Sequence, residues 1–211
     1  MGGVVSEHCF VWKQICASMN LPAPDAPDAR GDFQKLENAI MRGEITSEEM
    51  LHLLARRTGQ PEPPENYWKT FFAPKLHEPT VRLIRDLKAA GARVVCGSNT
   101  IDAHYDYHLE YGQYDCFDAV YASHLIGQVK PDSMFWQYIL DAENALAENS
   151  RCGTASECGA KRTAGSWTFS DMVFFDDMQK NVEAASSLGI HAHLFTTAED
   201  ARAFIATLPV T

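Results

Sequence analysis

The sequence predicts an α/β protein with a Rossmann-like parallel sheet core and a small helical cap inserted near the N-terminus. Three observations lead to this prediction. Past residue 78, short apolar runs rich in valine and phenylalanine alternate with amphipathic helices, which is typical of a parallel sheet. Between residues 7 and 78, apolar residues follow helical spacing and no strand pattern occurs. The composition, 45% hydrophobic over 211 residues, suffices for one buried core and an accessory module.

The segment 7–78 is expected to form three helices and an aromatic segment. The third helix opens with a capping box, in which Thr46 and Glu49 satisfy each other's backbone amides, and Gly59 ends it. We expect the rings of the aromatic segment to form the packing core of this module. The expected helices are 7–19, 32–42 and 48–57, and the segment 67–77 contains Trp68, Phe71 and Phe72.

The remainder is expected to contain four strands, each followed by a helix or a turn. Pro79-Thr80 opens a helix that Gly91 closes, and the strand RVVCGSN follows. The polar segment 148–171 is longer than an ordinary helix-to-strand connection, and we interpret it as a flexible insertion. The expected strands are 93–99, 118–123, 171–177 and 191–197, and the expected helices are 80–91, 102–111, 131–146, 180–189 and 198–207.

Polar side chains follow three of these strands at the point where each strand ends. In an open parallel sheet, binding sites form beyond the carboxyl ends of the strands. Each residue alone has an ordinary explanation as turn or cap chemistry. Together they supply what phosphoryl transfer needs: carboxylates for Mg²⁺, and a cation and a hydroxyl for phosphate oxygens. These residues are Ser98, Asn99, Lys130, Asp176, Asp177 and Asn181.

The motifs VVCGSNT, GQVKPD and VFFDDMQKNVEAASSLGI resemble the second, third and fourth motifs of the haloacid dehalogenase (HAD) superfamily of hydrolases. The resemblance covers essentially the whole chain, and the helical insertion is similar to the C1-type cap of that superfamily. Within it, VFFDD and RGEITSEE are most similar to α-D-glucose-1-phosphate phosphatases and the phosphatases like the N-terminal domain of epoxide hydrolases. The resemblance implies a core of residues 1–6 and 79–211 and a cap of residues 7–78.

The opening MGGVV resembles the residues that directly follow the nucleophilic aspartate of the first superfamily motif. The resemblance therefore implies that this aspartate and its strand precede Met1. That strand would lie inside the sheet, so we expect two unpaired ladders without it. We expect the 211 residues alone to be catalytically inactive and poorly stable, and we favour a start assigned too far downstream, or a truncated chain, over an evolved loss.

The resemblance also implies a role for each candidate residue. The upstream aspartate would attack phosphorus to form an aspartyl-phosphate, which water hydrolyses. Ser98 would bind a phosphoryl oxygen, and Lys130 would neutralise the transferring group. The expected Mg²⁺ ligands are Asp177 and the Gly2 carbonyl, with Asp176 and Asn181 acting through water. The phosphate-binding set is Gly2, Gly3, Ser98, Asn99 and Lys130, and candidate cap contacts with substrate are Glu7, His8, Trp12 and Arg42.

Two other functions remain open. A 2-haloacid dehalogenase uses the same nucleophile without a metal, but it generally lacks adjacent aspartates such as Asp176-Asp177. A non-catalytic binding or regulatory protein on this scaffold would fit the absent nucleophile. A response-regulator receiver is excluded by order, because its acidic pair follows the first strand. His104 and His108, four residues apart, are expected to mark an exposed helix face and not a metal site.

The net charge of −10 argues against nucleic acid or an anionic membrane as the main partner. The N-terminus has no basic segment leading into an apolar one, and no apolar run is long enough to span a bilayer. We therefore expect a cytoplasmic hydrolase, a monomer or a homodimer, that acts on a small phosphorylated metabolite.

Overall fold

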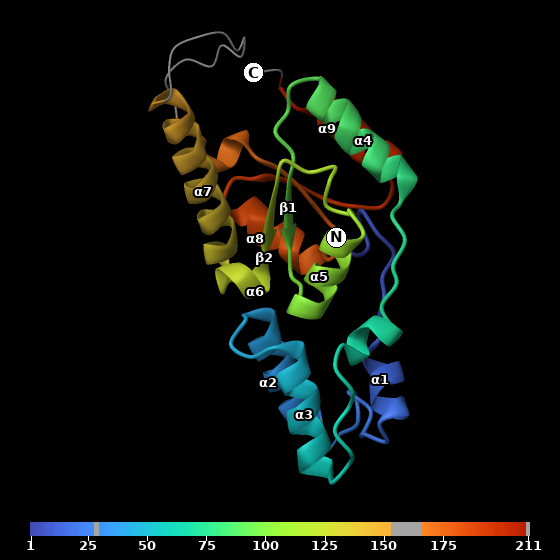
Figure 1. The fold of residues 1–211 in the computed structure, drawn as a ribbon. Coiled ribbons are helices and arrows are strands. Elements are labelled where there is room, and N and C mark those ends of the chain that lie inside the picture. The colour runs from blue at the N-terminus through green and yellow to red at the C-terminus, as the bar shows by residue number, and fades with distance from the viewer. Residues whose placement is uncertain (28–29, 153–165, 210–211) are drawn as a thin grey trace. The chain divides into compact units, whose positions relative to one another are not determined.

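The structure is a computed structural model that describes residues 1–27, 30–152 and 166–209 (Figure 1). It divides into two compact units, Met1–Val129 and Lys130–Thr211, which are described separately. The predicted boundaries between core and cap stay a prediction.

The predicted helical segment of the first unit is present and has its own hydrophobic core. Its third helix begins with the predicted capping box: Thr46 accepts from the Glu49 amide, and the Glu49 carboxylate accepts from the Thr46 amide. Trp68 and Phe72 are buried in this core, which confirms their predicted packing role, and Ile101 joins them from outside the segment. The elements are α1 (Trp12–Ser18), α2 (Arg30–Met41), α3 (Ser47–Thr58) and the short 3₁₀ helix η1 (Tyr67–Thr70).

The first helix begins later than predicted, at Trp12 instead of residue 7. The chain before it pairs with a distant segment, because the Glu7 amide donates to the Lys75 carbonyl at 2.9 Å and the His77 amide donates to the Val5 carbonyl at 2.8 Å. Backbone pairing between two segments distant in sequence therefore overrides the helical spacing. Val5 itself is buried against Val81.

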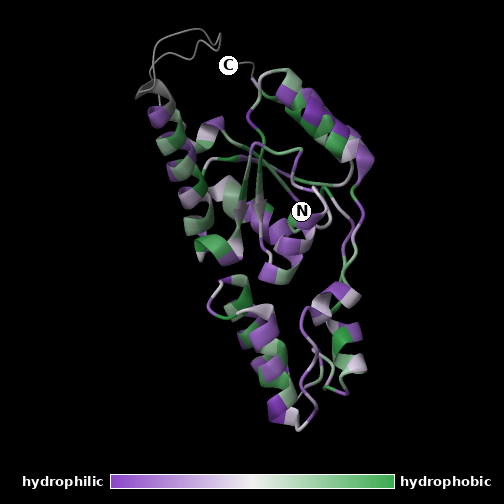
Figure 2. Ribbon diagram, in the orientation of Figure 1, coloured by the Kyte–Doolittle hydropathy of each residue, from purple (hydrophilic) through white to green (hydrophobic). Residues whose placement is uncertain are grey.

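The rest of the first unit contains one parallel strand pair with its flanking helices. Strand β1 (Val95–Ser98) pairs with β2 (Ala119–Ala122) in a register that places Ser98 opposite Ala122. Figure 2 shows that α4 carries both hydrophobic and hydrophilic residues, and its buried positions include Val81, Leu83 and Ile84. The helices are α4 (Glu78–Ala89), α5 (Asp102–Glu110) and the single turn α6 (Ser123–Ile126).

The second unit contains the other parallel pair. Strand β3 (Val173–Asp176) pairs with β4 (His191–Leu194), and Asp176 lies opposite Leu194. Phe135 and Trp136 are fully buried, and the Trp136 ring meets the Phe174 ring edge-on at 5.6 Å between centroids. The remaining elements are α7 (Ser133–Cys152), η2 (Phe169–Asp171), α8 (Gln179–Ser187) and α9 (Ala198–Thr207).

The predicted alternation of parallel strands and helices is confirmed. Within the described ranges the strands form two separate two-stranded sheets, β1–β2 and β3–β4. The predicted insertion 148–171 lies partly outside the described residues, since 153–165 are not covered. At its end, the Trp167 amide donates to the Asn144 side chain at 2.6 Å. In the part of the chain that the structure covers, no helix is both long enough and apolar enough to cross a bilayer.

Candidate active site

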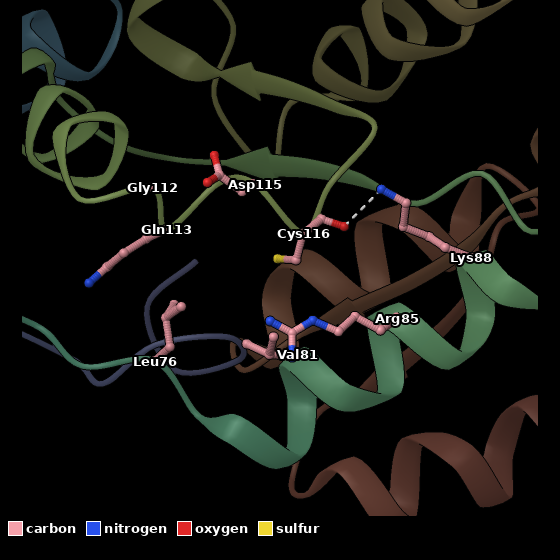
Figure 3. Close-up of a pocket in the computed structure, with 8 residues that line it drawn as sticks. All are labelled: Leu76, Val81, Arg85, Lys88, Gly112, Gln113, Asp115 and Cys116. Carbon is pink, nitrogen blue, oxygen red and sulfur yellow. Dashed lines mark hydrogen bonds between the residues drawn. The ribbon is translucent and has the colours of Figure 1, made fainter.

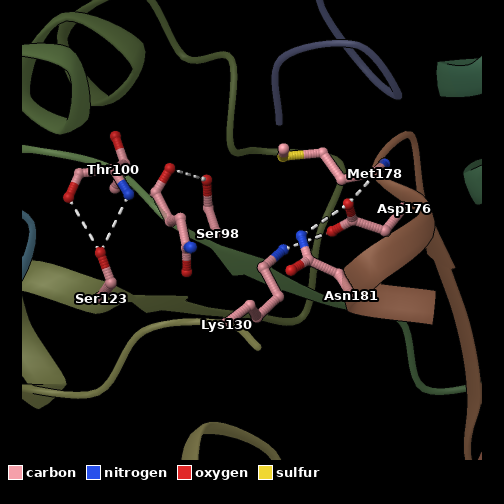
Figure 4. A network of polar contacts seen from close by, with 8 residues as sticks. Ser98, Thr100, Ser123, Lys130, Asp176, Met178 and Asn181 are labelled. Carbon is pink, nitrogen blue, oxygen red and sulfur yellow. Dashed lines mark hydrogen bonds and ion pairs between the residues drawn. The ribbon is translucent and has the colours of Figure 1, made fainter. Parts of the chain in front are cut away.

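A buried ion pair lies at the carboxyl end of β3. The Lys130 ammonium is 2.7 Å from Oδ2 of Asp176, and the two side chains are only 7% and 6% exposed (Figure 4). Asp176 is the last residue of its strand, so its side chain emerges where the sheet gives way to α8. The structure therefore has a buried ion pair at the carboxyl end of a parallel strand, the edge at which such sheets bind ligands.

Three donors hold the Asp176 carboxylate. Besides Lys130, the Asn181 amide donates to Oδ1 at 2.9 Å, and the Met178 backbone amide donates to the same oxygen at 2.9 Å. Burial by itself would raise the pKa of Asp176. The charge of Lys130 and these hydrogen bonds outweigh burial, so the pKa lies below its ordinary value. Asp176 is therefore an anion under ordinary conditions.

Aromatic rings flank the ammonium of Lys130. It lies 5.5 Å from the centroid of the Phe135 ring and 5.3 Å from that of Phe174. Ring faces attract a cation at this range, most strongly where water is excluded. The two rings and the Asp176 carboxylate thus hold the Lys130 side chain in a fixed place.

This corner of the second unit fits a magnesium ion in its chemistry. Oδ1 of Asn181 is buried and has no hydrogen-bond partner in the structure, so it offers an oxygen lone pair. Asp177 directly follows Asp176 in sequence and is half-buried, and its role as the direct ligand stays a prediction. Among the described residues, no three His, Cys, Asp or Glu side chains form a metal cluster. Mg²⁺ commonly keeps several waters and uses only one or two carboxylates, so the set here is compatible with it.

The first unit carries the hydroxyl group of the predicted site. Ser98 ends β1 and is 4% exposed, and its hydroxyl donates a long hydrogen bond, 3.5 Å, to the Asn99 carbonyl. Gly3 donates its amide to the Ser6 carbonyl at 2.8 Å, in the turn that contains Gly2. Because Ser98 and Lys130 belong to different units, their meeting with Asp177 at one site stays a prediction.

The sequence reasoning missed two candidate residues, Ser123 and Thr100. The Ser123 hydroxyl is bonded to the Thr100 backbone, and both side chains are buried (Figure 4). Ser123 directly follows β2, so the rule that selected Ser98 at the end of β1 could also have selected Ser123.

The predicted cap contacts each have a different local environment. The His8 ring stacks on Phe10 at 4.9 Å, and Trp12 meets the Trp68 ring edge-on at 4.3 Å. Arg42 donates to the carbonyl of Gly127 at 3.2 Å, at the end of α6. The Glu7 carboxylate accepts from the Lys75 amide at 3.2 Å. Their contact with substrate stays a prediction.

The expectation that His104 and His108 mark an exposed helix face is wrong. His108 is 4% exposed, and its Nδ1 lies 2.6 Å from the Gln113 side-chain oxygen. The His104 ring stacks on Phe72 with 3.7 Å between centroids. Burial, and secondarily the neighbouring His108, lowers the pKa of His104 to about 3. Burial lowers the pKa of His108 as well, so both histidines are aromatic packing groups of this core.

A cavity of about 340 Å³ lies in the first unit (Figure 3). Its lining includes Val81, Arg85 and Lys88 from α4 and the thiol of Cys116. Lys88 is already engaged, because it donates to the Cys116 carbonyl at 3.1 Å and pairs with Asp118 at 3.0 Å. None of the predicted site residues lines this cavity.

Known proteins share the architecture of this chain, although no family model matches it. The sesquiterpene phosphatase astK of Aspergillus oryzae is 26% identical over 199 residues, which cover 90% of this chain and 84% of that protein. A HAD family enzyme from Bacteroides thetaiotaomicron matches 97% of this chain and 95% of its own, with a TM-score of 0.71 and 16% identity. A predicted HAD-like family hydrolase from Porphyromonas gingivalis matches 98% of this chain and 94% of its own, with a TM-score of 0.67 and 16% identity.

The fold is therefore the α/β fold of these HAD family enzymes. The predicted resemblance to the haloacid dehalogenase superfamily is confirmed for the fold, while the cap type and the subgroup stay predictions. Structures of the Bacteroides enzyme have been solved in complex with magnesium, and with magnesium and inorganic phosphate.

Proposed function

We propose that this chain belongs to a Mg²⁺-dependent phosphatase that hydrolyses small phosphorylated metabolites, sugar phosphates among them, through an aspartyl-phosphate intermediate. The observation that carries the proposal is the buried network of Lys130, Asp176 and Asn181 at the end of β3, with Asp177 next to it. Its support comes also from the phosphatase relative and from fold neighbours solved with magnesium and phosphate.

Each of the candidate site residues has a specific role in the proposed reaction. Lys130 offsets the negative charge of the phosphoryl group and of the attacking carboxylate, which lowers the barrier electrostatically. Asp176 fixes the lysine, and Asn181 fixes Asp176. Ser98 donates its hydroxyl to a phosphoryl oxygen. Mg²⁺, held by Asp177 with the Gly2 carbonyl and waters, would supply further positive charge when bound.

The attacking group in the proposal is the aspartate of the first superfamily motif. Its carboxylate oxygen bonds to phosphorus while the ester oxygen leaves, and water then cleaves the acyl phosphate. The superfamily resemblance implies that Gly2 stands where many members carry an acid–base aspartate, so the proposal favours esters with good leaving groups, such as sugar 1-phosphates.

The test uses two proteins: the 211-residue chain, and the same chain preceded by the aspartate-ending strand. Hydrolysis of p-nitrophenyl phosphate is measured with and without EDTA, followed by a panel of sugar phosphates, nucleotides and prenyl phosphates. We expect turnover by the extended protein, abolished by EDTA and by Asp177→Asn. The matched control is Asp171→Asn, which removes an acid from η2. Metal-independent turnover, or turnover unaffected by Asp177→Asn, would refute the proposal.

The same assay separates the two alternatives. A dehalogenase would release halide from 2-haloacids in the presence of EDTA, because its reaction uses no metal. A binding protein would retain phosphate affinity and show no turnover in either form.

A further inference from the structure

We propose that Ser123 is a positioning residue for the phosphate-binding loop that follows β1, an inference that rests on the proposed function. The loop begins directly after Ser98, the last residue of β1 and the predicted donor to a phosphoryl oxygen. Ser123 touches it at Thr100 through two hydrogen bonds. The Thr100 amide donates to the Ser123 hydroxyl oxygen at 3.0 Å, and that hydroxyl donates to the Thr100 carbonyl at 2.9 Å.

The position of Ser123 follows from the register of the sheet. Ser98 lies opposite Ala122, and Ser123 is the residue that follows Ala122. Beyond Ser98 and Ala122 the two strands no longer pair, so the Thr100 amide and carbonyl have no partner in the β1–β2 ladder. Thr100 is 8% exposed and Ser123 is 0% exposed. A buried backbone group without a partner is costly, and one hydroxyl here satisfies both groups of a single residue.

The two hydrogen bonds from the Ser123 hydroxyl to the amide and the carbonyl of Thr100 fix both the position and the orientation of Thr100. On the far side, the loop is held by Ile101, which is buried in the helical core, and by Asp102, whose carboxylate accepts from the Ser47 amide at 3.0 Å. The Ser98 hydroxyl therefore lies where β1 passes into a loop that is held in its middle by Ser123 and at its end by Asp102. Catalytic donors need such support to remain within a fraction of an ångström.

Ser123 is not itself a nucleophile in this arrangement. Its proton is donated to a carbonyl oxygen, and the residue is fully buried. Its contribution to catalysis passes through Thr100 to Ser98.

The experiment compares Ser123→Ala with Thr80→Val, which removes another buried hydroxyl of the first unit, on α4. Both are made in the form of the protein that hydrolyses phosphate esters. Calorimetry measures the affinity for inorganic phosphate and, separately, for Mg²⁺. We expect Ser123→Ala to weaken phosphate binding and to lower kcat by at least about tenfold each, with Mg²⁺ affinity within about twofold of wild type. Thr80→Val should leave all three unchanged.

The outcomes distinguish a failure of the inference about Ser123 from a failure of the proposed phosphatase function. Wild-type protein without turnover or phosphate affinity would remove the proposed function, and the inference with it. Wild-type turnover with unchanged phosphate affinity in Ser123→Ala would overturn the inference alone. An equal loss of phosphate and Mg²⁺ affinity, with a lower Tm, would mean that Ser123 is merely structural and would also overturn it.

Discussion

Lys130 and Asp176 are 46 residues apart in the chain, and their charged atoms lie 2.7 Å apart in the interior of the second unit. Removing one partner of such a pair leaves the other charge buried without compensation. Lys130→Met should therefore lower the free energy of unfolding by about 3–5 kcal/mol. Urea denaturation measures this, and the control is Lys180→Met, an exposed lysine of α8. Equal effects of the two substitutions would contradict the buried pair.

Asp118 connects the beginnings of β1 and β2. Its carboxylate accepts from the Val94 amide at 2.8 Å and pairs with Lys88 at 3.0 Å. Burial raises the pKa of Asp118, but the hydrogen bond from Val94 and the interactions with Lys88 outweigh it, so the pKa is lowered. A lowered carboxyl pKa contributes stability that is present above the unfolded value, about 3.9, and is lost as the pH falls through the folded value.

We therefore expect the unfolding free energy to fall more steeply below about pH 4 in wild type than in Asp118→Asn. Urea titrations from acid to neutral pH measure the two slopes. Parallel curves would show that Asp118 carries no such contribution.

The stacked, neutral His104 predicts a second pH effect of the same sign. Because burial lowers its pKa from 6.5 to about 3, the unfolded chain binds a proton that the folded chain does not. This difference reduces stability as the pH falls below 6.5 and is absent at neutral pH. His104→Phe should keep the stack on Phe72 and make stability less dependent on pH in that range. In NMR spectra the His104 ring signal should not titrate between about pH 5 and 8; a midpoint near the ordinary value would contradict the burial.

The turn between α2 and α3 approaches α6 closely at Gly43. A Cβ at this position would clash with the His124 carbonyl oxygen, and φ is +70°. Gly59 has a similar φ of +68°, but no atom lies within 4 Å of the place that its Cβ would take, so it serves as the matched control. Gly59→Ala should cost about 1 kcal/mol through backbone strain, and Gly43→Ala clearly more, because a backbone carbonyl must move as well. Thermal and urea unfolding compare the two, and equal losses would mean that the turn does not contact α6.

Much of the fold could be predicted because its signals are local. The capping box at Thr46 and Glu49 and the residues at the ends of β1 and β3 follow from spacing and side-chain chemistry within a few residues. The start of α1 could not be predicted, because the residues before it pair with the chain around Lys75. The burial of His104 was missed for the same reason: its neighbour Phe72 comes from a different segment.

The order of strands and helices, and the polar residues that end the strands, can be read from the amino-acid sequence because periodicity and capping act over one or two turns. The contacts of those residues cannot be read from the sequence. Lys130 pairs with Asp176, and Ser123 bonds to the amide and carbonyl of Thr100, only once the chain has folded. These contacts join residues 23 and 46 positions apart, and their geometry depends on packing and strand register, which no local pattern encodes.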